Sequence, residues 1–157
     1  ASNLGGHVRQ FRTNVTGGWG DFQERFVVPL SIVPPNPWGI TTGDFNNDGR
    51  LDIAVAQTDR LHVANGNGDG TFAAPAVYNT VNHLFDRRLA TGDFNNDGWL
   101  DIIGGANAGT NGVTLALNNG SGAFPVATSI PVGFFSDEVG VADFNGDGNL
   151  DFVASPN

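Results

Sequence analysis

One nine-residue pattern, D-x-N-x-D-G-x-x-D, occurs three times in this chain and constrains its fold more than any other feature. The three copies begin at Asp44, Asp93 and Asp143, so that successive copies are 49 and 50 residues apart. A second marker, Gly-x-Gly-x-Phe, recurs with spacings of 50 and 52 residues, beginning at Gly18, Gly68 and Gly120. Because two unrelated markers keep nearly one period, the chain contains an internal repeat of about fifty residues.

Each repeat contains short apolar segments between clusters of Gly and Asn, which is the pattern of β-strands joined by tight turns. We name the four strands of a repeat A to D. They are expected at 40–45, 51–56, 61–64 and 76–81, and again at 89–94, 100–104, 113–117 and 126–132. The chain opens on a C–D pair, 7–12 and 26–32, and closes on an A–B pair, 139–144 and 150–154. No window shows a sustained helical period, so we expect little or no helix.

Four antiparallel strands in a repeat of this length indicate a β-propeller blade. We therefore predict an all-β fold of three four-stranded antiparallel blades, circularly offset along the chain as C–D, ABCD, ABCD, A–B. A sandwich of about twelve strands is the alternative. The chain is expected to form a single β-propeller segment over residues 1–157. Its approximate repeats are 1–38, 39–87, 88–138 and 139–157, of which the first and last are half-blades.

The repeated loop carries the chemistry. Its positions 1, 3, 5 and 9 offer side-chain oxygens, position 7 offers a backbone carbonyl, and Gly at position 6 permits a sharp turn. Oxygen-only ligands in a flexible ring suit Ca²⁺ better than Mg²⁺, zinc or copper. An EF-hand starts in the same way, but it needs Glu at position 12, where this chain has Val55, Gly104 and Ala154. The alternative is a turn satisfied by its own Asn and Asp side chains.

Nine of the fourteen Asp residues lie in these three loops. Carboxylates crowded within a few ångströms repel one another, so that they favour a bound cation. We therefore predict three Ca²⁺ sites. The predicted ligands are Asp44, Asn46, Asp48, Arg50 and Asp52; Asp93, Asn95, Asp97, Trp99 and Asp101; and Asp143, Asn145, Asp147, Asn149 and Asp151.

Composition excludes several function classes. The formal net charge is −9, with seven Arg and no Lys, so no basic surface indicates nucleic-acid binding. The absence of Cys excludes a thiol nucleophile and a disulfide framework. No apolar run approaches the length of a membrane-spanning helix. Neither HExxH nor GxSxG occurs, and we expect no catalytic activity.

The loop, its flanking strands and the Gly-rich turn before each Phe resemble the FG-GAP/VCBS repeat family. Those repeats are blades of calcium-binding β-propellers, as in the head of integrin alpha chains. The resemblance covers essentially the whole chain, and it implies that each Asp-rich loop joins strands A and B. The FG-GAP dipeptides themselves are not intact here, and three blades are fewer than such rings usually contain.

The B–C and D–A connections share the end of the blades opposite the Asp-rich loops. Aromatic side chains beside Arg, Asn and acids make that end a candidate ligand face for a glycan or a protein. The alternative is that the aromatic side chains wedge between blades. The candidate ligand face comprises Trp38, Asp59, Arg60, His83, Phe85, Arg87, Arg88, Asn107, Asn111, Phe134, Phe135, Asp137 and Glu138.

We interpret the chain as a secreted, extracellular calcium-binding scaffold for adhesion, lectin-like glycan binding or assembly. Free Ca²⁺ is abundant outside cells, which suits weak sites of about 10⁻⁴–10⁻³ M. The alternative function is a propeller segment of a secreted polysaccharide-degrading enzyme, a lyase or a glycosidase. Asn14 and Asn119 begin N-glycosylation sequons, although eighteen Asn residues make chance matches expected.

The half-blades at the two ends predict a homo-oligomer. The A–B pair of one chain would complete the C–D pair of another, and the result is a six-blade dimer or a filament. In the alternative, the remainder of a longer propeller supplies the missing strands.

Overall fold

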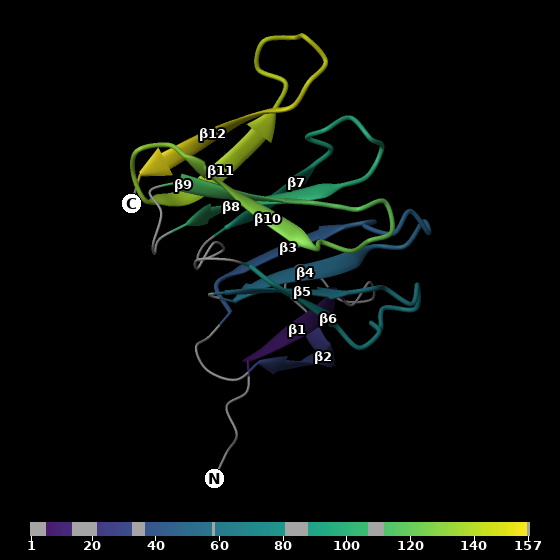
Figure 1. Ribbon diagram of the computed structural model, residues 1–157. Coiled ribbons are helices and arrows are strands. Elements are labelled where there is room, and N and C mark those ends of the chain that lie inside the picture. The colour runs from purple at the N-terminus through teal and green to yellow at the C-terminus, as the bar shows by residue number, and fades with distance from the viewer. Residues whose placement is uncertain are drawn as a thin grey trace.

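The computed structural model describes residues 6–13, 22–32, 37–57, 59–80, 88–106 and 112–156, the first two ranges by their backbone alone. In these ranges twelve strands form four antiparallel sheets that follow one another along the chain, and no helix occurs (Figure 1). The part of the chain described therefore holds no helix that could cross a membrane.

The strand order confirms the predicted offset of the blades. The first sheet is the half-blade of β1 (Gly6–Thr13) and β2 (Phe22–Ile32). Blade 1 has the order β3 (Gly39–Gly43), β4 (Asp52–Gln57), β5 (Arg60–Ala64), β6 (Ala76–Asn79). Blade 2 has the order β7 (Leu89–Gly92), β8 (Asp101–Ala106), β9 (Gly112–Leu117), β10 (Val126–Pro131). The last sheet is the half-blade of β11 (Ser136–Ala142) and β12 (Asp151–Pro156).

Some strand boundaries differ from the expected ones. Strands β3 and β7 end at Gly43 and Gly92, before the Asp that opens each loop, and the side chain of that Asp accepts a hydrogen bond from an amide of the loop. Strand β11 begins at Ser136, so the expectation that Asp137 and Glu138 lie in a D–A connection was wrong. The register of β11 against β12 shifts there, and the buried Ser136 hydroxyl donates to the Glu138 carbonyl at 3.1 Å.

The A strands β3, β7 and β11 lie side by side, which aligns the blades in chain order. Every residue of β4 and β8 is buried, because these B strands are covered on both faces. Between blades 1 and 2, the Phe45 ring packs edge-on against Phe124 with ring centroids 5.6 Å apart. Tyr78 contacts the same Phe124 ring at 5.9 Å. This core holds the first two Asp-rich loops next to each other.

Candidate metal sites

The three Asp-rich loops share one backbone conformation. The Asp at position 1 accepts hydrogen bonds from the amides of positions 5 and 6. In loop 1, Asp48 N donates to Asp44 Oδ1 at 3.0 Å and Gly49 N donates to Asp44 Oδ2 at 2.7 Å. The same pair of bonds is formed at 3.0 and 2.8 Å in loop 2, and at 3.2 and 2.8 Å in loop 3. Three independent copies therefore fold around their first carboxylate.

Glycine at position 6 is required by the backbone rather than by crowding. Gly49, Gly98 and Gly148 have φ values of 81°, 85° and 87°, in the left-handed region that side chains disfavour. A Cβ at any of the three would meet no atom within 4 Å. The positive φ, and not a close contact, therefore accounts for glycine at this position.

The residues at positions 3 and 5 of each loop are joined by two hydrogen bonds. In loop 1 the Asn46 amide nitrogen donates to Asp48 Oδ2 at 2.9 Å, and the Asn46 oxygen accepts from Asp48 N at 3.1 Å. The equivalent bonds are present in loops 2 and 3. Loop 1 differs in one respect, because the Arg50 guanidinium also donates to Asp48 Oδ2 at 2.5 Å. Trp99 and Asn149 stand at that position in the other loops and bring no positive charge.

The Asp at position 9 ties the loop to the Gly-rich turn between strands C and D. Asp52 is fully buried and accepts from Phe45 N at 3.0 Å and from Gly66 N at 2.8 Å. Asp101 is equally buried and accepts from Phe94 N at 2.9 Å and from Asn118 N at 2.8 Å. Position 9 therefore has a structural role that the sequence pattern did not reveal.

The electrostatics of the loops differ between position 9 and the exposed positions. Burial raises the pKa of Asp52 and of Asp101, and their neighbouring loop carboxylates raise it further, although backbone amides oppose both effects. In loop 3, the amide of Gly148 is the main cause that lowers the pKa of Asp143, and the amide of Asn149 is the main cause that lowers the pKa of Asp147. In loops 1 and 2 the carboxylates are thus close enough to repel one another.

The loops also contact each other through position 4. Asn47 has a left-handed φ of 54° and its Nδ2 donates to the Gly98 carbonyl of loop 2 at 3.3 Å. Asn96 has a φ of 56° and its Nδ2 donates to Asn149 Oδ1 of loop 3 at 2.7 Å. In loop 3 the same position is Gly146, which has no side chain to extend the series. The three loops therefore form one row along one end of the blades.

The donor set of each loop fits a calcium ion. It contains only oxygen ligands, three carboxylates and one amide, together with the carbonyl of position 7. Within the described ranges, no three His, Cys, Asp or Glu side chains are already grouped as a metal site. The carboxylates are instead held by hydrogen bonds, and each oxygen of Asp44 and of Asp93 accepts one bond and keeps a further lone pair. Asp48 Oδ2 already accepts two bonds, from Asn46 and Arg50.

Comparison with known families matches the FG-GAP-like repeat to three stretches of the chain, residues 2–55, 44–104 and 93–154. The chain belongs to the FG-GAP-like repeat family. Each matched stretch ends on an Asp-rich loop and the strand that follows it, and FG-GAP-like repeats commonly bind calcium. A search of curated proteins and a search of solved structures each found no match.

The candidate ligand face of this FG-GAP-like chain is brought together only in part. Arg88 Nε lies 3.2 Å from the Glu138 carboxylate, which links blade 2 to the last half-blade. Arg60 Nε lies 3.8 Å from Asp59 at the turn into β5. Trp38 and Phe135 are 55% and 43% exposed, and Phe134 is half-buried. Five predicted members lie outside the described residues: His83, Phe85, Arg87, Asn107 and Asn111.

Asn118 is a buried residue of the FG-GAP-like blades that sequence reasoning missed. Its Nδ2 donates to the Phe45 carbonyl of loop 1 at 2.8 Å and to the Leu100 carbonyl at 3.1 Å. Its Oδ1 accepts from Gly120 N and Gly122 N at 3.1 and 3.0 Å. It therefore joins loop 1 to the C–D turn of blade 2. Nothing in the local pattern predicted this role, because the equivalent residue of blade 1 is Gly66.

Proposed function

We propose that this chain binds three calcium ions and is a non-catalytic, extracellular β-propeller scaffold for adhesion or glycan binding. The observation that carries the proposal is the row of three Asp-rich loops, each with the same oxygen-only donors on the same backbone. The side chains of positions 1, 3, 5 and 9 and the carbonyl of position 7 would hold the ion. Membership of the FG-GAP-like family supports the choice of metal.

Calcium supplies charge neutralisation to this scaffold. Three divalent ions would change the formal net charge from −9 to −3, and they would relieve the repulsion among the carboxylates within each loop. Loop 1 already has the Arg50 guanidinium on Asp48. We therefore expect loop 1 to bind calcium most weakly. Sites of about 10⁻⁴–10⁻³ M are filled outside cells, where free Ca²⁺ is abundant.

We place the ligand-binding surface at the end of the blades opposite the calcium loops. Trp38 and Phe135 expose aromatic rings there, and the Arg88–Glu138 pair adds hydrogen-bonding groups of both charges. Aromatic rings beside a few polar groups are typical of surfaces that recognise partners. Sugars present both apolar faces and hydroxyl groups, so a glycan fits this combination.

A glycan array probed with the calcium-loaded chain tests the ligand. We expect binding to a defined set of glycans, with the signal reduced about tenfold or more in Trp38→Ala and Phe135→Ala, because each loses a large contact surface. Val126→Ala is the matched control, since it removes a 65% exposed apolar side chain from β10 near the calcium loops. Equal signals for all four proteins would reject a ligand site at this end, and cleavage of an arrayed polysaccharide would favour the enzyme alternative.

A further inference from the structure

The contact between blades 1 and 2 shows what normally covers the face of a blade in this chain. Phe45, from the loop of blade 1, is fully buried against Phe124 of blade 2. Leu89 and Leu100 of blade 2 pack against the same cluster. A Cβ on Gly122 would come within 3.1 Å of Asn46 Cβ, so the loop backbone lies directly on the C–D turn. The preceding blade thus covers the loop end of the next one.

The equivalent face of blade 1 is open. Ile40 and Leu51 correspond in the repeat to Leu89 and Leu100, yet they are 53% and 67% exposed. Phe72 corresponds to Phe124 and is only half-buried, packed on Ile53 and its neighbours. We call Ile40, Leu51 and Phe72 the acceptor surface. No A–B loop from a preceding blade covers it within the described residues.

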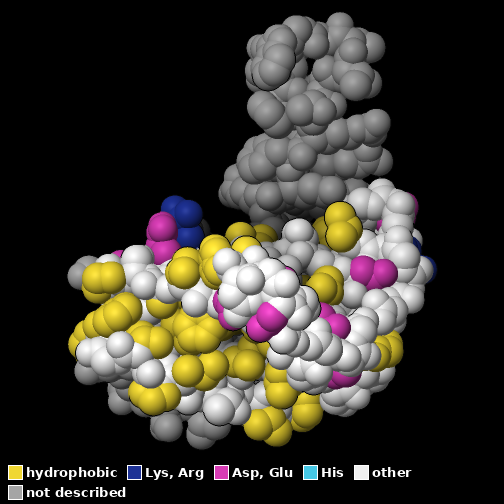
Figure 2. Space-filling model, turned by 90° about the horizontal axis from the view of Figure 1, so that it is seen from above, with side chains coloured by type: hydrophobic (Ala, Val, Ile, Leu, Met, Phe, Trp, Pro, Cys, Tyr) yellow, Lys and Arg dark blue, Asp and Glu magenta, His cyan; other side chains and the backbone are white. Residues whose placement is uncertain are grey.

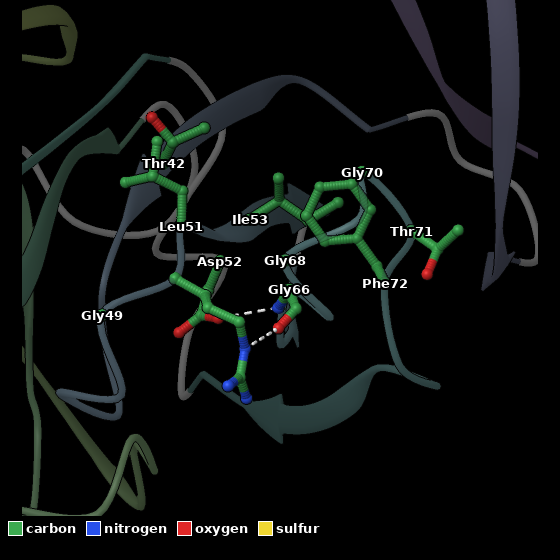
Figure 3. A pocket seen from close by; sticks show the side chains of 11 residues that line it. Thr42, Gly49, Leu51, Asp52, Ile53, Gly66, Gly68, Gly70, Thr71 and Phe72 are labelled. Atoms are coloured by element: carbon green, nitrogen blue, oxygen red, sulfur yellow. Dashed lines mark hydrogen bonds between the residues drawn. The ribbon is translucent and has the colours of Figure 1, made fainter.

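A pocket of about 590 Å³ lies on the acceptor surface, at the place where a preceding loop would sit. Figure 3 shows Phe72 beside Ile53 in its wall, together with Leu51 and the glycines of the C–D turn. Gly70, which lines the pocket, corresponds to the Gly122 that loop 1 covers in blade 2. The lining is mainly apolar, and the repeat predicts that a phenylalanine equivalent to Phe45 fills it.

The other end of the chain carries the matching surface. Phe144 corresponds to Phe45 and is 58% exposed, and Val153 corresponds to the fully buried Ala54 and is 54% exposed. Figure 2 looks onto this end of the molecule, where hydrophobic side chains gather beside acidic ones. We call Phe144 and Val153 the donor surface. The chain therefore exposes both halves of a contact that it buries internally.

We propose that the pocket of the acceptor surface is the seat of Phe144 from a second copy of this chain. Strand β12 of that copy would pair with β1, as β4 pairs with β5, and its donor surface would cover blade 1. Two copies joined in this way at both ends would contain six four-stranded blades. This inference concerns assembly and does not depend on the glycan proposed above.

The contact between copies lacks two hydrogen bonds of the internal one. Asn47 and Asn118 bond across the internal contact, whereas Gly146 and Gly66 occupy the equivalent positions between copies. Gly146 has a φ of 78°, a left-handed conformation that Asn47 also adopts. Gly146→Asn is therefore expected to add one of these bonds and to tighten the assembly.

Sedimentation of the calcium-loaded chain tests the proposal. We expect an assembly of at least twice the 16.4 kDa of one chain. Phe144→Ala and Phe72→Ala should each weaken it about tenfold or more, since a buried aromatic contact is lost. Phe135→Ala removes an equally large exposed side chain outside the contact and is the control that should leave the mass unchanged. A monomeric chain, or an assembly insensitive to Phe144→Ala, would overturn the proposal.

Disulfide trapping tests the geometry independently, because the chain has no cysteine of its own. A Cβ added at Gly43 would lie 2.9 Å from Leu100 Cδ1, and a Cβ added at Gly92 would lie 2.5 Å from Leu150 Cδ1. Each leucine directly precedes the B strand of the next blade or half-blade. Between copies the equivalent pair is Ala142 and Leu51. A mixture of Ala142→Cys and Leu51→Cys should form a covalent pair on oxidation, whereas Phe135→Cys mixed with Leu51→Cys should not. Equal yields from the two mixtures would overturn the proposed contact.

Discussion

Asp101→Ala is expected to lower the free energy of unfolding by about 3–5 kcal/mol, even in the presence of a chelator. Asp101 is fully buried, and its two oxygens accept from Phe94 N and Asn118 N, which belong to the loop and to the C–D turn of blade 2. Alanine leaves both amides without these acceptors. The desolvation that raises the pKa of Asp101 offsets part of the loss, because removing the carboxylate also removes its burial cost.

Asp151→Ala is the matched control for this prediction. Asp151 has the same position in loop 3, but it is only half-buried, and it accepts from Phe144 N at 3.1 Å. We expect a loss of about 1 kcal/mol. Urea unfolding of both variants in the presence of a chelator measures the effect of the lost hydrogen bonds apart from that of metal binding, because neither protein then holds calcium. Equal losses would contradict the role assigned to Asp101.

Removing calcium from the intact chain is expected to lower the melting temperature by about 10 °C. Each site filled at about 1 mM Ca²⁺ with a dissociation constant of about 10⁻⁴ M adds about 1.4 kcal/mol of stability. Three such sites add about 4 kcal/mol, and for a chain of this size each kcal/mol corresponds to about 2–4 °C. The physical reason is that the carboxylates of each loop repel one another without a cation.

Differential scanning calorimetry with and without EDTA measures this effect, and excess calcium should restore the original melting temperature. The double substitution Asp93→Asn and Asp97→Asn serves as an internal control. It removes two carboxylates from loop 2 while keeping side chains of similar size, so calcium should then raise the melting temperature by a smaller amount. A melting temperature that is the same with and without EDTA would reject calcium as a source of stability.

Much of the fold was predictable because the signal is repeated. Three copies of the loop and of the Gly-rich turn place the strands on either side of them, and the strand order of all four sheets agrees with that prediction. Strand ends were harder to predict, as at Ser136, where a bulge lets β11 begin before the apolar run that starts at Val139. Such an irregularity depends on pairing with a distant strand.

The contacts between blades were not predictable from the pattern. Asn47 and Asn96 read as ordinary turn residues, yet each bonds to the loop of the next blade, about fifty residues away along the chain. Asp52 and Asp101 were predicted only as metal ligands, and their burial against the C–D turn is a property of the assembled blade. These roles depend on which segments meet in space, which the period of the repeat does not specify.

The central claim, that the three Asp-rich loops are calcium sites, is tested most directly by isothermal titration of the metal-free chain with Ca²⁺. We predict three ions bound per chain, the weakest at loop 1, where Arg50 already lies on Asp48. The Asp93→Asn and Asp97→Asn double variant should bind two. Binding of no calcium up to about 10 mM, well above the range of weak extracellular sites, or a stoichiometry that the double variant leaves unchanged, would contradict the claim.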